Sequence, residues 1–140
     1  MLLLIGKILL LSIFFLSGIS KIKNFKGTVS GFKNVFFPKK LPNFIYNLII
    51  FLVIVLEILG PIIIIYNSQT YNLPELSYYS SISLAIFTLL ATYLYHNPMT
   101  QKGQFYYFMK NVSIIGGLLI LSSIVWFFIL FNIIWITINL

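Results

Sequence analysis

One apolar stretch decides the fold, because it is long enough to cross a membrane and has an acid at its centre. Residues 44–66 read FIYNLIIFLVIVLEILGPIIIIY. A transmembrane helix needs about 20 mostly apolar residues, so this stretch predicts a membrane span. Glu57 lies near its middle, where an ionisable side chain costs about 2.5 kcal/mol or more. We therefore expect Glu57 to face the interior of a helix bundle and to have a partner there.

The composition of the chain indicates the same class of protein. Of its 140 residues, 60% are hydrophobic and 8% are charged, whereas soluble domains have about 25% charged residues. Three further apolar runs are long enough to span a membrane, at residues 2–19, 78–95 and 112–130. The sequence therefore predicts one domain over residues 1–140: an all-α, polytopic membrane protein folded as a four-transmembrane-helix bundle, with an apolar C-terminal extension at residues 131–140.

The residues that the chain lacks exclude several kinds of chemistry. There is no cysteine, so thiol redox chemistry and thiolate metal ligation are not available. One histidine and two acids, far apart in the sequence, do not predict a metal site. No nucleophile has a base beside it. We therefore predict no catalytic residue, and we do not expect the chain to be an enzyme by itself.

The positive charges lie beside the predicted spans. All nine bases are lysines, and eight of them lie within or next to two connections, residues 22–42 and 97–110. This pattern favours lipid headgroups as counterions over nucleic acid. Lysine-rich connections stay in the cytoplasm. We therefore predict that both connections are cytoplasmic and that the two termini lie outside.

The connection at residues 22–42 has two interpretations. Phe25, Val29 and Phe32 recur at helical spacing, which predicts a short helix lying in the membrane interface. Gly27 and Gly31 favour a basic loop instead, since glycine weakens a helix. The sequence does not decide between them.

Lys7 is the candidate partner of Glu57. It lies five residues from the outer end of its predicted span, and Glu57 lies nine residues from the outer end of its own. Their depths then differ by about 6 Å, which a lysine side chain can reach. We predict a Lys7–Glu57 pair inside the bundle. It would either fix the helix register or handle a proton or ligand directly; the remaining alternative is a protonated, hydrogen-bonded Glu57.

A second polar group is expected at the cytoplasmic end of the bundle. Such a rim could bind a lipid headgroup, a quinone carbonyl or an anion, although helix capping and extension of lysines to the interface explain the same residue types. Its predicted members are Lys21, His96, Asn97, Lys110 and Asn111.

Small residues predict where the helices pack closely, because they let the backbones of membrane helices approach each other. The predicted packing positions are Gly18, Ala85, Ser113, Gly116 and Gly117.

Several short motifs occur in a characteristic order along the chain. The first span ends with Ser17–Lys21, Glu57 lies in the second, and His96 closes the third. The fourth opens with Phe108–Asn111 and continues through Gly116-Gly117-Leu118-Leu119. On these residues the sequence resembles the DoxX family of small four-helix membrane proteins.

The chain also departs from the pattern of this family. Lys7 stands where the family often has arginine, so a forked contact with a carboxylate is lost. The aromatic pair usual after the His-Asn step is replaced by Pro98-Met99. The absence of arginine, with heavy use of isoleucine and asparagine, indicates an AT-rich genome such as that of a large virus or an intracellular bacterium.

The resemblance implies a membrane component of electron-transfer or oxidative-stress complexes, since relatives include a small subunit of a thiosulfate:quinone oxidoreductase. We therefore expect a non-catalytic subunit of a redox-linked complex that binds quinone, the one implied cofactor, or lipid between its helices. The alternative is a structural or assembly protein of a viral or bacterial membrane without ligand chemistry. In both cases the expected partners are membrane lipids and other membrane-protein subunits, or further copies of the chain.

Overall fold

Helices form all the regular structure in the described part of the chain, which is residues 1–35, 41–70, 73–96 and 103–139 of a computed structural model. Four of them, α1, α3, α4 and α5, are long and apolar enough to cross a membrane. The predicted all-α class is therefore confirmed. The helices are α1 (Leu2–Lys23), α2 (Phe25–Val35), α3 (Asn43–Thr70), α4 (Pro74–Tyr95) and α5 (Phe105–Asn139).

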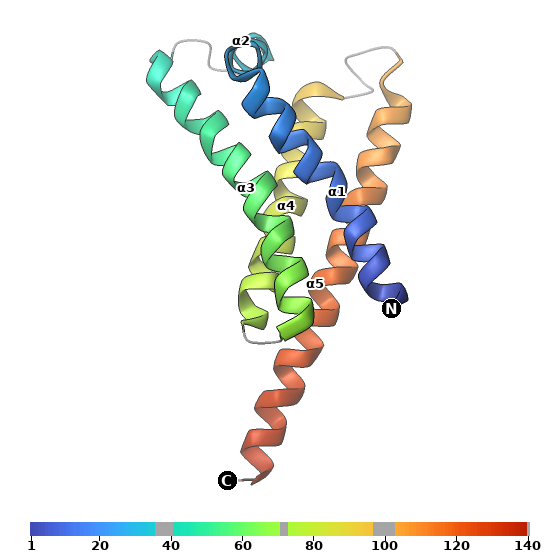
Figure 1. The fold of residues 1–140 in the computed structure, drawn as a ribbon. Coiled ribbons are helices and arrows are strands. Elements are labelled where there is room, and N and C mark those ends of the chain that lie inside the picture. The colour runs from blue at the N-terminus through green and yellow to red at the C-terminus, as the bar shows by residue number, and fades with distance from the viewer. Residues whose placement is uncertain (36–40, 71–72, 97–102, 140) are drawn as a thin grey trace.

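The helices extend further than the apolar runs that predicted them. The helix α1 continues to Lys23, and α3 continues to Thr70. The helix α5 is continuous to Asn139, so the predicted extension at residues 131–140 belongs to it as far as the structure describes the chain. At 35 residues, α5 is about 52 Å long. Its C-terminal end projects beyond the other helices (Figure 1).

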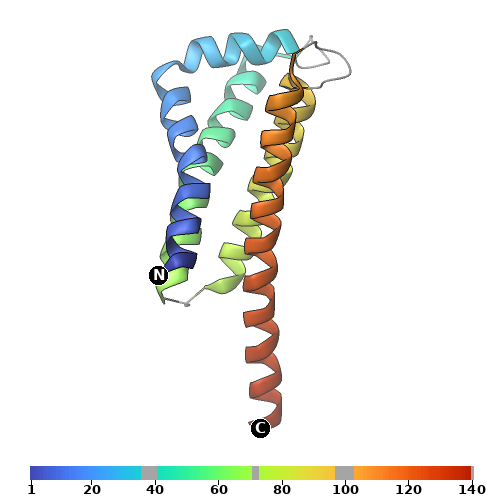
Figure 2. The same cartoon turned by 90° about the vertical axis from the view of Figure 1, so that its right-hand side faces the viewer.

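The long helices pack in the order of the chain, α1 against α3, α3 against α4 and α4 against α5. The short helix α2 runs across one end of the bundle, at the end opposite the N-terminus (Figure 2). Its Val29 and Phe32 are buried in a cluster with Tyr46 and Ile50 of α3. Of the two interpretations of this connection, the structure therefore has the helix.

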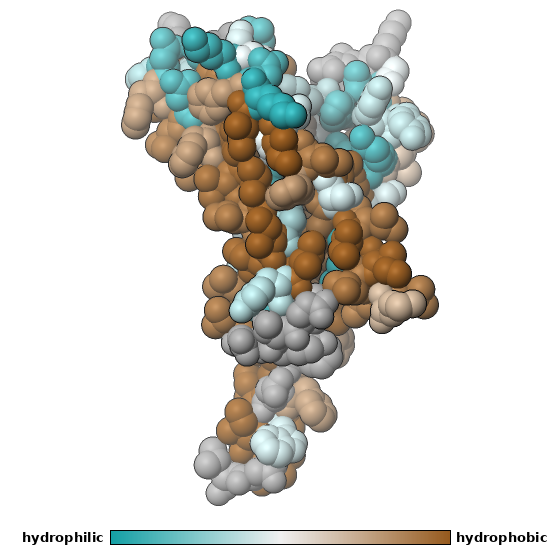
Figure 3. Space-filling view, in the orientation of Figure 1, coloured by the Kyte–Doolittle hydropathy of each residue, from teal (hydrophilic) through white to brown (hydrophobic). Residues whose placement is uncertain are grey.

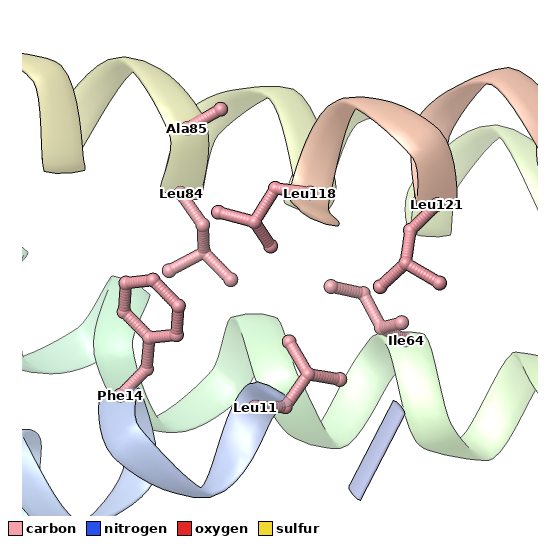
Figure 4. Close-up of a cluster of buried hydrophobic side chains, with 7 residues drawn as sticks. All are labelled: Leu11, Phe14, Ile64, Leu84, Ala85, Leu118 and Leu121. Carbon is pink, nitrogen blue, oxygen red and sulfur yellow. The ribbon is translucent and has the colours of Figure 1, made fainter. Parts of the chain in front are cut away.

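An apolar core joins the four long helices. Its side chains point towards one another from α1, α3, α4 and α5 (Figure 4). Ala85, predicted to be a packing position, is one of them. The buried members of this core are Leu11, Phe14, Ile64, Leu84, Ala85, Leu118 and Leu121.

Large apolar side chains also cover the outside of the bundle. Figure 3 shows a hydrophobic surface over the long helices, with hydrophilic residues gathered around the end where α2 lies. Phe51 and Leu89, for example, are more than half exposed. Such a surface suits a protein surrounded by hydrocarbon.

Candidate functional site

A buried ion pair joins α1 to α3. The Lys21 Nζ donates to Oε1 and Oε2 of Glu57 at 2.8 and 2.7 Å. It also lies 2.6 Å from Ser17 Oγ, which in turn donates to Glu57 Oε1 at 3.2 Å. Only 2% of Glu57 is exposed. Both carboxylate oxygens are therefore hydrogen-bonded inside the bundle.

The local structure of α1 explains why Lys21 reaches the interior. Helical side chains point back towards the N-terminus of their helix, so the Lys21 ammonium returns to the level of Ser17, one turn earlier. Gly18 lies beside it, and a Cβ atom there would stand 2.8 Å from Ile58 Cγ1 and 3.3 Å from Glu57 Cβ. The missing side chain at this position lets α3 bring Glu57 close to α1.

The predicted Lys7–Glu57 pair is therefore corrected, because Glu57 pairs with Lys21. Since α3 continues to Thr70, Glu57 lies about 20 Å from the C-terminal end of its helix, whereas Lys7 lies about 8 Å from the start of α1. The difference of about 12 Å exceeds what a lysine side chain spans. Lys7 is nevertheless buried, with 9% of its surface exposed.

The other predicted polar residues meet where α4 ends and α5 begins. The His96 ring stacks on Tyr107, with 5.2 Å between ring centres, and its Nδ1 lies 2.8 Å from Gln104 Oε1. The Lys110 Nζ lies 5.6 Å from the centre of the same Tyr107 ring. These contacts bring His96 and Lys110 together, whereas Lys21 belongs to the ion pair with Glu57.

Two further members of the predicted rim have different outcomes. The Asn111 Nδ2 donates to Thr92 Oγ1 of α4 at 2.9 Å. Thr92 precedes His96 by about one helical turn. Asn97 lies outside the described residues. Sequence reasoning missed Gln104 and Tyr107, although the aromatic run Phe105–Tyr107 at the start of α5 was a usable signal for a ring contact with His96.

Of the small residues predicted to pack on the fourth span, Gly117 lies at a contact between helices. A Cβ atom there would stand 3.1 Å from Leu10 Cδ2 of α1. The assignments of Gly116 and Ser113 are corrected. No described atom outside its own helical turn lies within 4 Å of a Cβ placed on Gly116, and Ser113 is exposed. Each glycine faces a different direction, since successive helical residues differ by about 100°.

From the contact between Leu10 and Gly117, α1 and α5 diverge towards the end where α2 lies (Figure 1). We call the space between them the α1–α5 opening. It has a volume of about 460 Å³ and is open to the side. Its lining residues are Leu10, Tyr106, Met109, Lys110, Ser113 and Ile114.

Lys110 of α5 is the charged residue among those that line the α1–α5 opening. Counted from the contact between the two antiparallel helices, Ser17 lies seven residues along α1 and Lys110 seven residues along α5, so both lie about 10 Å from it. Lys21 shares one face of α1 with Leu10, because eleven residues make three helical turns. Lys21 is directed to Glu57 of α3, however, and is not among the residues that line the opening.

This arrangement is suited to binding. The ammonium group of Lys110 is a hydrogen-bond donor for carbonyl, phosphate or carboxylate oxygens, and Met109 and Ile114 add an apolar wall. Among the residues that the structure describes, no three His, Cys, Asp or Glu side chains lie together as metal ligands would. The arrangement can thus hold an amphiphilic molecule with its polar group near Lys110.

Comparison with known proteins supplies one match. A family model described as DoxX matches residues 2–97, which is more than half of the chain. No curated protein and no solved structure matches the chain. The predicted resemblance is confirmed, and together with the four apolar helices it identifies an integral, multi-pass membrane protein.

Proposed function

The chain belongs to the DoxX family, and on that premise we propose that it is a non-catalytic subunit of a redox-linked membrane complex that binds a quinone or a lipid between its helices. The α1–α5 opening is the proposed site. The single observation behind this proposal is the opening itself, with apolar side chains along its wall and the charged Lys110 beside them.

The dimensions and the lining of the opening suit such a ligand. Its volume of about 460 Å³ lies within the usual range of small-molecule sites, about 300 to 1,000 Å³. An isoprenoid or acyl chain would lie against Leu10, Met109 and Ile114. A ring carbonyl or a phosphate oxygen would accept a hydrogen bond from the ammonium of Lys110.

The Lys21–Glu57 pair is assigned a positioning role in this proposal. It fixes α1 on α3, and therefore fixes α1 in the position from which it diverges from α5. A buried pair whose oxygens are all hydrogen-bonded has a defined geometry. The ion pair thus sets the shape of one wall without contributing a reaction step.

The test is native mass spectrometry of the full chain in a mild nonionic detergent. The unmodified chain is expected to retain a molecule with the mass of a quinone or a phospholipid. The variant Ser113→Phe puts a ring into the opening and is expected to lose it. Ser123→Phe is the matched control, because Ser123 is exposed on the same helix and, like Ser113, donates to a backbone carbonyl of the preceding turn.

The outcomes separate a specific site from general lipid adsorption. Loss in Ser113→Phe with retention in Ser123→Phe supports the proposal, and the mass distinguishes a quinone from a lipid. Equal retention in all three chains, or no retained molecule in any of them, contradicts it.

A second candidate function is that of an assembly protein, and the projecting C-terminal end of α5 favours it. Phe131, Ile134 and Ile138 are exposed there, beyond Trp126, whose ring still contacts Tyr78 of α4. A chain shortened by residues 131–140 would then lose a partner subunit in affinity purification but keep the retained small molecule. Loss of the small molecule with the partner unchanged contradicts the assembly function.

A further inference from the structure

The charge of Lys110 in the α1–α5 opening has no carboxylate side chain of its own chain to pair with. The acids of the chain are Glu57 and Glu75. Glu57 accepts hydrogen bonds from Lys21 on both of its oxygens. Glu75 lies in the first turn of α4, whereas Lys110 lies near the start of α5, at the opposite end of the bundle (Figure 1). A group from outside the chain therefore has to balance the charge of Lys110.

The ring of Tyr107 holds the Lys110 ammonium in place. The Lys110 Nζ lies 5.6 Å from the centre of this ring, within the range of a cation–π contact. His96 stacks on Tyr107 and is itself held by Gln104, 2.8 Å from its Nδ1. The ammonium has three N–H donors, and no residue that the structure describes accepts a hydrogen bond from them. All three donors are thus available to a ligand.

The opening is accessible from the bilayer. It is open to the side and has Leu10 in its apolar wall. The outside of the two helices that form it is apolar as well, with Leu9 of α1 exposed by 70% and Ile120 of α5 by 62%. Tyr106, next to the level of Lys110, also lines the opening, and tyrosine is typical of the headgroup level of a membrane. A membrane lipid therefore fits with its chain on the wall and its headgroup at Lys110.

We propose that the ligand of the α1–α5 opening is an acidic glycerophospholipid whose phosphate oxygens accept hydrogen bonds from Lys110. This inference rests on the proposed function, since it specifies the ligand of the same site. The charge of the ligand is the deciding property. A quinone carbonyl is neutral, and phosphatidylcholine has a cation of its own beside its phosphate. Phosphatidylglycerol has a net negative charge that balances the ammonium, and its acyl chain distinguishes it from free phosphate.

The test measures lipid binding to the full chain in a mild nonionic detergent. Phosphatidylglycerol, phosphatidylcholine with the same acyl chains, and ubiquinone are titrated separately, and native mass spectrometry gives the bound fraction at each concentration. Phosphatidylglycerol is expected to bind about fivefold more tightly than phosphatidylcholine, which is the effect of one lysine at an anionic membrane surface. Inorganic phosphate at an equal concentration is expected not to displace it, because phosphate has no chain for the apolar wall.

Two variants assign this preference to Lys110. Lys110→Gln removes the charge and is expected to bind both phospholipids equally, with its affinity for phosphatidylcholine unchanged because the wall is intact. Lys26→Gln is the matched control. Lys26 is an exposed lysine of α2, at the same end of the bundle (Figure 2), and it does not line the opening. This control is expected to keep the fivefold preference. Glutamine favours a helix about as well as lysine, so both variants are expected to fold.

Several outcomes would overturn the acidic phospholipid while the proposed function stands. These are equal binding of the two phospholipids to the unmodified chain, an undiminished preference in Lys110→Gln, and binding of ubiquinone with neither phospholipid bound. A preference that falls equally in Lys26→Gln would show a general effect of the lysine-rich end and also overturn the inference. Displacement by inorganic phosphate would assign the site to the free ion. If none of the three ligands binds, the inference and the proposed function both fail.

Discussion

At the scale of single residues, Glu57 is tolerated inside the bundle because both of its oxygens accept hydrogen bonds from Lys21. A charge in a medium of low dielectric constant is costly unless it is paired and hydrogen-bonded. Ser17 adds a third donor. The three side chains thus stabilise one another, but removing Lys21 and removing the charge of Glu57 are expected to change the free energy of unfolding by different amounts.

Lys21→Met is expected to lower the free energy of unfolding by about 3 to 5 kcal/mol, because it leaves Glu57 buried without its cation. Glu57→Gln is expected to cost less. The amide oxygen still accepts from Ser17, and the side chain of Lys21, 23% exposed, can extend to the membrane surface. Denaturant titration of the purified variants measures both values.

The double variant Lys21→Met with Glu57→Leu provides the control. It is expected to be more stable than Lys21→Met alone, since replacing a whole buried pair by apolar residues is often neutral. Additive losses from the two single changes would show that the two side chains are not coupled in the folded chain.

The sequence was sufficient to predict that Glu57 faces inward and has a lysine as its partner, but not to identify that lysine. Each residue of error in a helix end shifts the depth by about 1.5 Å. The predicted end at residue 66 and the observed end at Thr70 therefore differ by about 6 Å. Gly18, one turn before Lys21, was the available signal that the close approach of α3 occurs at that level.

At the scale of helices, the contact between α1 and α3 depends on Gly18. In Gly18→Ala the new methyl group would meet the side chain of Ile58, so we expect a loss of about 1 to 3 kcal/mol in the free energy of unfolding. Gly116→Ala is the matched control, because its methyl group meets open space, and alanine favours a helix over glycine by up to about 1 kcal/mol. Denaturation midpoints of the two variants that shift in the same direction would contradict this account.

The existence of the four long helices could be predicted from the length of the apolar runs. The helical state of α2 and the point at which α5 ends could not. The choice of a helix for α2 depends on burial of Val29 and Phe32 against α3, which is a tertiary contact. Residues 131–140 were separated from the fourth span because a bilayer needs only about 20 residues. Run length does not indicate where a helix stops when the residues on both sides of the membrane boundary are apolar.

At the scale of the whole molecule, α2 and the start of α4 lie at opposite ends of the bundle (Figure 1). The chain has no cysteine, so a single introduced cysteine can be labelled without background from native cysteines. With the predicted orientation, Glu75→Cys in intact cells reacts with a membrane-impermeant maleimide. Ser30→Cys, in exposed α2 sequence, reacts only after the membrane is permeabilised. The reverse labelling pattern would invert the orientation.

The membrane class was predictable from composition, whereas the α1–α5 opening was not. Its shape depends on the divergence of two helices that are far apart in the sequence, Leu10 and Gly117 being their point of approach. Helical periodicity identifies faces within one element and contains no information on the angle between two. The sequence therefore indicated the polar residues Lys21, His96 and Lys110 but not how they divide between two clusters.

The contact between Leu10 and Gly117 also sets how closely α1 and α5 approach at the narrow end of the opening. Lys110 stands about 10 Å along α5 from this contact. A change of about 10° in the angle between α1 and α5 at the contact would therefore change the distance between the backbones of Ser17 and Lys110 by about 2 Å. A larger side chain at position 117 would thus alter the width of the opening without itself lining it.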